Sequence, residues 1–115
     1  MLVSQDPRLV VVRYFEMWNG GDLSIAPEIL AEDWLDHAHP EVRGPAAVQE
    51  AVAKTRAAQP DLHFEIDALL GGEGQLAVAG TVRVSREAPA TRLLWLVTLK
   101  DDRMIEMRTY RDTAP

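Results

Sequence analysis

The chain has 115 residues, 47% of them hydrophobic, which suffices for one folded domain with its own core. With 18 acidic and 12 basic residues its formal net charge is −6, which disfavours nucleic acid and anionic membrane as partners. It contains no cysteine, so disulfides, thiolate metal sites and cysteine nucleophiles are excluded. The N-terminus lacks the pattern of a signal peptide, and no apolar run approaches the ~20 residues that cross a bilayer. We therefore expect a soluble, cytoplasmic protein with a single domain over residues 1–115.

Two helices are expected near the N-terminus. The first begins with Asp6 as its N-cap and Pro7 in its first turn, and the Asn-Gly-Gly sequence at 19–21 ends it. Asp22 can cap a second, short helix. Pro27 lies inside that span and removes a backbone donor, so we expect regular helix only from Pro27 onward.

A short strand and a third helix are expected next. Residues 33–39 have no helical stripe and are predicted to form a strand. Gly44 and Pro45 begin the third helix, because proline is favoured at the first helical position. Its buried face carries apolar residues from Val48 onward, and the Gln-Pro-Asp sequence at 59–61 ends it.

The rest of the chain is predicted to be antiparallel sheet. Apolar and polar residues alternate over 62–68, which is typical of a strand with one dry face, and the glycines of 71–74 indicate a turn. Returning strands are expected at 76–85, 93–99 and 104–111. The strand at 93–99 is apolar on both faces, so it is central or covered by a partner chain. The fold class is α+β, with a curved, mostly antiparallel sheet wrapped as a cone around three N-terminal helices, and the mouth of the cone is a natural cleft.

Residues 32–40 gather more proton-transferring groups than any other segment: two histidines, two aspartates and Trp34. An imidazole with a pKa near ~6.5 suits proton transfer, so His37 is a candidate general base or hydrogen-bond partner on a pocket wall. The alternative is a histidine bonded to backbone where the strand leaves the helix. On a strand, His37 and His39 would share one face and Asp36 would lie on the other. That separation disfavours a metal site, and we expect none.

Six short motifs follow one another over almost the whole chain: Val12-Arg13-Tyr14-Phe15, Trp18-Asn19-Gly20-Gly21-Asp22, Asp33-Trp34-Leu35-Asp36-His37, Arg43-Gly44-Pro45, Pro60-Asp61-Leu62 and Asp102-Arg103-Met104-Ile105-Glu106-Met107-Arg108. In this order they resemble the SnoaL-like branch of the nuclear transport factor 2-like superfamily, which is related to ketosteroid isomerase and polyketide cyclases. The resemblance implies a cone-shaped domain with a deep apolar pocket, often dimeric and usually without a cofactor. It does not fix an activity, because this fold hosts many functions.

The resemblance also implies positions for catalytic groups. Against ketosteroid isomerase, Tyr14 falls on the catalytic tyrosine and the base falls at His37 or Ala38. The acid of the oxyanion hole falls on Trp95, which has no carboxyl proton to donate. Against the SnoaL-like cyclases, the acid/base aspartate and its helping histidine fall on Thr109 and Trp95, and threonine cannot take a proton near neutral pH. The chain thus departs from both sets of catalytic groups.

Aromatic side chains are expected to border the pocket. A buried phenol needs a hydrogen-bond partner, and for Tyr14 this is His37 or Asp36, in a pairing that is either catalytic or structural. The side chains expected around a ligand are Trp18, Trp34, His39, Trp95, Val97, Met107, Thr109 and Arg111.

Arg111 is the one cation in that set. It lies two residues beyond Thr109 and on the same strand face, so it would stand near the mouth if that face lines the cone. There its guanidinium can hold a carboxylate or carbonyl group. The alternative is an exposed arginine paired to Asp112 or Glu106.

Two classes of function remain open. The first is a cofactor-independent enzyme acting on a largely hydrophobic compound, with His37 as base and Tyr14 as donor to a developing oxyanion, in isomerisation, cyclisation or dehydration. The second is a non-catalytic module that binds an apolar metabolite or pairs with another chain. Leu94, Leu96 and Tyr110 make the outer sheet face apolar, which favours a homodimer.

Overall fold

The computed structural model describes residues 6–72 and 74–111 of the chain. Its elements are, in order, α1 (Pro7–Gly20), the 3₁₀ turn η1 (Leu23–Ile25), α2 (Ala26–Ile29), β1 (Leu30–Asp36), α3 (Gly44–Ala58), β2 (His63–Gly72), β3 (Gln75–Arg83), β4 (Thr91–Lys100) and β5 (Arg103–Arg111). The strands form one open sheet in the order β1-β5-β4-β3-β2. β1 runs parallel to β5, and the other neighbours are antiparallel.

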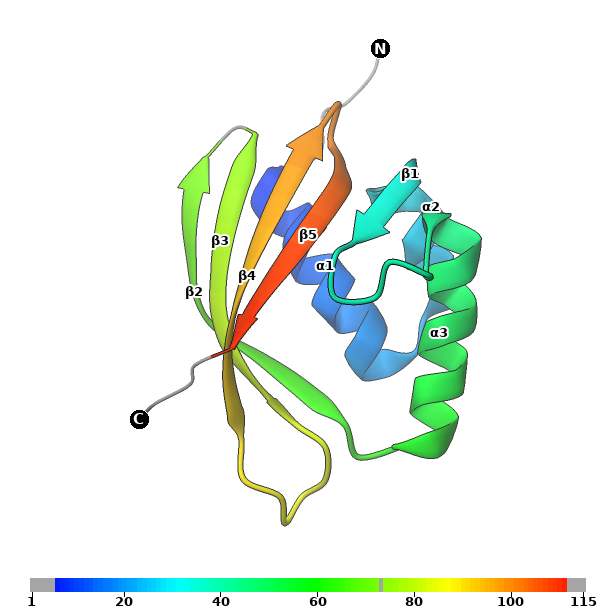
Figure 1. The fold of residues 1–115 in the computed structure, drawn as a ribbon, viewed down its shortest axis with the longest axis vertical. Helices are drawn as coiled ribbons and strands as arrows, with labels where there is room; N and C mark the ends of the chain where they lie inside the picture. The colour runs from blue at the N-terminus through cyan, green and yellow to red at the C-terminus, as the bar shows by residue number, and fades with distance from the viewer. Residues whose placement is uncertain (1–5, 73, 112–115) are drawn as a thin grey trace.

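The expected α+β fold is confirmed: a curved, mostly antiparallel sheet wraps around three helices. In Figure 1 the strands fan out beside α1, while α2 and α3 lie on the far side of β1. β4 is the central strand, as its two apolar faces predicted. None of the helices in residues 6–72 and 74–111 is both long and apolar enough to cross a membrane.

The ends of α1 and the start of α3 follow from local sequence. The Asp6 carboxylate accepts a 3.0 Å hydrogen bond from the backbone N–H of Arg8, as expected of an N-cap. Gly21 ends α1 in the left-handed conformation, with φ of 77°, and its N–H donates to the Met17 carbonyl. α3 begins at Gly44, as predicted. These predicted boundaries are confirmed. They could be predicted because each depends only on residues close in the chain.

The second helix and the early strand differ from the prediction. A short helix, regular from Pro27 onward, was expected, and α2 is shorter still, with only four residues, because the chain turns into β1 at Leu30. β1 ends at Asp36, so the two histidines lie beyond it. The Asp36 carboxylate accepts a 2.9 Å hydrogen bond from the Ala38 N–H, and its carbonyl accepts one from the His39 N–H. This turn stops the strand, so the expected alternation of His37 and His39 on one strand face is wrong.

A bulge in the middle of the β2–β3 pair contributes to the curl of the sheet. The alternation predicted over 62–68 is confirmed, but a bulge between Ile66 and Ala68 then shifts the pairing with β3. Gly80 pairs with Ile66 at this bulge. A Cβ atom on Gly80 would lie 2.2 Å from the Glu65 carbonyl oxygen and 3.2 Å from the Trp95 ring. Only glycine allows the strands to approach this closely, so Gly80 is a structural requirement of the curl.

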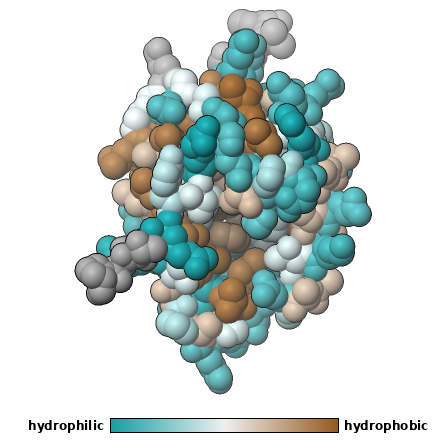
Figure 2. Space-filling view, in the orientation of Figure 1, coloured by the Kyte–Doolittle hydropathy of each residue, from teal (hydrophilic) through white to brown (hydrophobic). Residues whose placement is uncertain are grey.

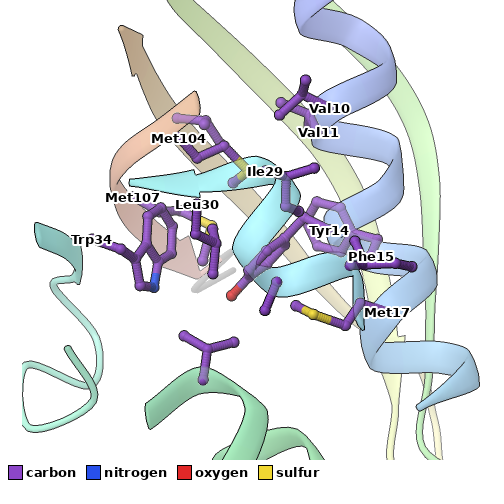
Figure 3. Close-up of a cluster of buried hydrophobic side chains, with 14 of the residues drawn as sticks. Val10, Val11, Tyr14, Phe15, Met17, Ile29, Leu30, Trp34, Met104 and Met107 are labelled. Carbon is purple, nitrogen blue, oxygen red and sulfur yellow. The ribbon is translucent and has the colours of Figure 1, made fainter. Parts of the chain in front are cut away.

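The core lies between the concave face of the sheet and α1, and it closes at one end with aromatic rings. Figure 3 shows Val10, Val11, Tyr14 and Phe15 projecting from α1 toward the methionines of β5. Phe15 makes an edge contact with Trp95 of β4, with ring centroids 4.8 Å apart. These contacts fix the aromatic residues of α1 against the sheet, beside a cavity between the two.

Candidate functional site

A cavity of about 500 Å³ lies between α1 and the inner face of the sheet. The apolar walls of the cavity come from α1, β2 and β4. Most of its polar groups come from β5, from the end of β1 and from the turn that follows β1. The space-filling view shows a shaded recess near the centre of the molecule, with hydrophilic residues above it and apolar residues directly below it (Figure 2). The side chains predicted to surround a ligand that do line this cavity are Tyr14, Trp18, His39, Trp95, Met107, Thr109 and Arg111.

A smaller hollow of about 120 Å³ adjoins the cavity, and we call it the side chamber. It shares Tyr14, Trp18, Asp36 and some neighbouring residues with the main cavity, so the two spaces are in contact. It also takes in Trp34, whose side chain is fully buried, and apolar residues of α3. Trp34 therefore borders the side chamber and not the main cavity.

Asp36 is the one buried charged side chain in residues 6–72 and 74–111, with 8% of its surface exposed. It lines both the cavity and the side chamber. Burial raises the pKa of the Asp36 carboxyl above its ordinary value, and the Ala38 hydrogen bond and the nearby histidines only partly oppose that effect. A carboxyl group in this state can exchange a proton with a bound molecule closer to neutral pH than an exposed aspartate can.

Tyr14 lies beside Asp36 and is almost completely buried. Burial raises the pKa of the Tyr14 hydroxyl, and the negative charge of Asp36 raises it further. The neighbouring Trp18 indole lowers this pKa by a smaller amount. The phenol is therefore protonated at neutral pH and can act as a hydrogen-bond donor. Its ring centroid lies 5.6 Å from that of Trp34, and Figure 3 shows the Tyr14 hydroxyl and the Trp34 indole nitrogen both directed toward α3.

His37 lies outside the cavity, which corrects its predicted position on the pocket wall. Its Nε2 atom is 2.8 Å from Oε2 of Glu106, and the two side chains are 29% and 39% exposed. The reason is the turn after β1: the His37 backbone N–H donates to the Met107 carbonyl, and the side chain leaves on the outer side. The His37 hydrogen bond lowers the pKa of the Glu106 carboxyl. Asp36, predicted from the sequence as a hydrogen-bond partner for Tyr14 and not as the proton-transferring group, occupies the inner position.

Val97 also differs from its expected place. It is fully buried in the core and is not among the residues that line the cavity. Its cross-strand partner Met107 does reach the cavity. Arg111 lines the cavity together with Met107 and Thr109, so the predicted shared strand face holds in β5.

The sequence reasoning missed several wall residues. Leu62 and Phe64 line the cavity, and both lie at apolar positions of the alternation over 62–68, so a signal for them existed. Thr55 and Leu93 also line it, but nothing in the sequence separates them from ordinary core residues. No three His, Asp or Glu side chains in the described part of the chain are grouped so that they could bind a metal ion.

The sequence and the fold were compared with known proteins. The model of the SnoaL-like domain family matches residues 11–107. No curated protein matches the chain. A SnoaL-like polyketide cyclase from Agrobacterium tumefaciens C58 superposes with a TM-score of 0.77 and 14% identity, covering 95% of this chain and 93% of that one.

Two further solved structures have the same arrangement. IdmH, a putative polyketide cyclase from Streptomyces antibioticus, has a TM-score of 0.74 and 17% identity, with 94% and 93% of the two chains covered. A protein of unknown function with a cystatin-like fold from Methylobium petroleophilum PM1 has a TM-score of 0.81 and 14% identity, with 95% and 77% covered. At these identities the likeness establishes the fold and not an activity.

Proposed function

The chain belongs to the SnoaL-like domain family, and from that premise we propose that it binds a small, largely hydrophobic molecule and catalyses acid/base chemistry on it. Asp36 is the proton-transferring group, and Tyr14 donates a hydrogen bond to oxygen. The observation that carries this proposal is a buried carboxyl beside a buried phenol, both lining one cavity. The reaction class is isomerisation, cyclisation or dehydration of a carbonyl compound.

The walls define the class of ligand. Phe15, Phe64, Leu93 and Trp95 supply apolar and aromatic surface, and about 500 Å³ falls in the range of pockets that hold small molecules. Few polar groups point inward, so most of the ligand is apolar. Arg111, at the end of β5, is available for a polar group at the other end of the ligand.

The chemistry follows from the two polar groups. The Asp36 carboxylate takes a proton from a carbon next to the carbonyl of the ligand, and the electron pair moves onto the carbonyl oxygen. The Tyr14 hydroxyl stabilises the negative charge that develops there. The enolate then regains the proton from Asp36 at another carbon, or attacks a second carbonyl whose oxygen takes that proton, or expels a neighbouring hydroxyl group that leaves as water with that proton. These outcomes are the three reactions named above, and none requires a cofactor.

A test uses the proton transfer itself and needs no knowledge of the natural substrate. In D₂O the protein should accelerate exchange of the protons next to the carbonyl of 1-tetralone, a small bicyclic ketone, as followed by NMR. Asp36→Asn keeps the shape of the side chain but removes the base, so the exchange rate should fall by about 10²-fold or more. His37→Ala is the matched control, because that imidazole lies outside the cavity, and its rate should stay within about twofold of wild type.

The control also contains the result that would overturn the assignment. If His37→Ala loses exchange while Asp36→Asn retains it, the roles given to the two residues are reversed. If the protein binds the ketone but exchanges no protons, it is a binding module, which is the alternative function. Binding is measured separately by quenching of tryptophan fluorescence, since Trp18 and Trp95 line the cavity.

We also propose that the protein is a homodimer through the outer face of the sheet. Leu94 and Tyr110 are 40% and 49% exposed and face each other across β4 and β5, with Leu96 two residues farther along β4. Contiguous apolar side chains of this kind are uncommon on the surface of a monomer. Light scattering should therefore give twice the mass of the chain, and Leu94→Glu should give a monomer. A monomeric wild-type protein would contradict the proposal.

A further inference from the structure

The indole Nε1 atoms of Trp34 and Trp18 are buried donors that make no hydrogen bond of normal geometry in the described part of the chain, although the Trp18 indole lies near enough to the Tyr14 hydroxyl to lower its pKa. Buried donors of this kind are rare, because each loses its hydrogen bond to water without gaining another. The indole nitrogen can only donate, so an occupant that satisfies it must bring an acceptor atom. A bound molecule that places an acceptor atom beside these nitrogens would satisfy them.

Both indoles border the side chamber, and Tyr14 lies between them. The ring centroid of Tyr14 is 6.4 Å from that of Trp18 and 5.6 Å from that of Trp34. Trp18 comes from α1 and Trp34 from β1, so the two donors approach from different elements. In Figure 3 the Trp34 nitrogen and the Tyr14 oxygen are on the α3 side of their rings, where the chamber is bounded by Val48.

The shape and charge of the chamber limit what can occupy it. Its volume of about 120 Å³ holds a small polar group but not the body of a ligand, which remains in the adjoining cavity. Asp36 lines the same chamber, and its carboxylate repels an anion. A neutral carbonyl oxygen fits these conditions, because its two lone pairs match two N–H donors.

We propose that Trp18 and Trp34 form a subsite that binds the carbonyl oxygen of the ligand through their indole N–H groups. This subsite deepens the proposed function and rests on it, since it decides which end of the ligand enters the side chamber. The carbonyl points inward, and the apolar body lies against the aromatic wall. When the oxygen becomes an enolate it gains a third lone pair, for which the Tyr14 hydroxyl is available.

The experiment compares two probes of nearly equal size: 1-tetralone, which has one carbonyl oxygen, and tetralin, which has none. The protein is labelled with ¹⁵N-tryptophan, and its three indole signals are assigned with Trp→Phe variants. With 1-tetralone, the indole protons of Trp18 and Trp34 should move downfield; with tetralin, they should not. Trp95 is the internal control, because its ring lines the cavity but lies outside the side chamber.

Affinities give a second measurement. Trp34→Phe removes one donor and should weaken binding of 1-tetralone by about 3- to 10-fold without the same loss for tetralin. Trp95→Phe removes apolar surface and should weaken both probes alike. If Trp34→Phe does not fold, the wild-type indole shifts decide the matter alone.

The outcomes separate the subsite from the function on which it rests. If both probes bind and the indole signals of Trp18 and Trp34 respond to them identically, the carbonyl subsite is wrong, but the cavity remains a ligand site. If neither probe binds at all, the proposed function fails and the subsite fails with it.

Discussion

Asp36 and His37 are adjacent in the chain but lie in opposite environments. The Asp36 carboxylate is buried, lines the cavity and has a raised pKa, whereas the His37 imidazole is half-buried on the outer side, paired to Glu106. A histidine is the more usual proton-transfer group near neutral pH. The comparison teaches that burial decides which group can act: burial raises the pKa of the Asp36 carboxyl toward neutral pH, while the partly exposed His37–Glu106 pair lies outside the cavity.

Substitution of Tyr14 is expected to give the largest effect on the inner side of this comparison. Tyr14→Phe removes the hydroxyl that stabilises the developing oxyanion and should lower the rate of 1-tetralone exchange by about 10²-fold. Tyr110→Phe is the matched control, because that ring is exposed on the outer sheet face, and its exchange rate should not change. NMR exchange rates measured on both variants decide the matter. If both variants lose the same fraction of the exchange rate, the Tyr14 hydroxyl supports the fold and has no specific role in the reaction.

The two carboxyl groups should respond to pH in opposite directions. The Asp36 pKa is raised above its ordinary 3.8, so its contribution to stability is present at low pH and is lost as pH rises through the folded-state pKa. Asp36→Asn should remove this loss and make the protein more stable than wild type above that pKa. Urea unfolding of both proteins between pH 3 and pH 8 measures this difference in the free energy of unfolding. A variant less stable than wild type over the whole range would contradict the assignment.

Glu106 is the control in the same unfolding series, and its effect should be the smallest. Its lowered pKa means that its contribution is present above the ordinary value of 4.5 and is lost as pH falls through the lowered pKa. Because Glu106 and His37 are both partly exposed, Glu106→Gln should cost less than about 1 kcal/mol, and less at high salt. A larger cost would mean that the outer pair is more important to the fold than its exposure indicates.

The parts of the fold that were predictable depend on neighbours in the chain. The cap at Asp6, the glycine end of α1 and the alternation in β2 were all read from residues within a few positions of one another. The shared face of Met107, Thr109 and Arg111 was predictable for the same reason, since nothing interrupts the period of two along that part of β5.

What could not be predicted depends on contacts far apart in the chain. β1 pairs in parallel with β5, about 70 residues later. That pairing, together with the hydrogen bond from Ala38 to Asp36, ends the strand before the histidines. The strand ends at Asp36 and not at residue 39, and the turn that follows leaves the Asp36 side chain inward and the His37 side chain outside the cavity, so the expected places of the two are exchanged. Locally the sequence is equally compatible with both arrangements.

Gly80 has a consequence for anyone who wishes to redesign this protein. The bend of the sheet depends on position 80, where no side chain fits, so the curvature around the cavity is set by the backbone. Wall residues such as Leu93 and Thr109 shape the space without making this close approach between strands. Libraries that vary such wall residues and keep position 80 as glycine would alter which molecules are accepted while the bend is retained.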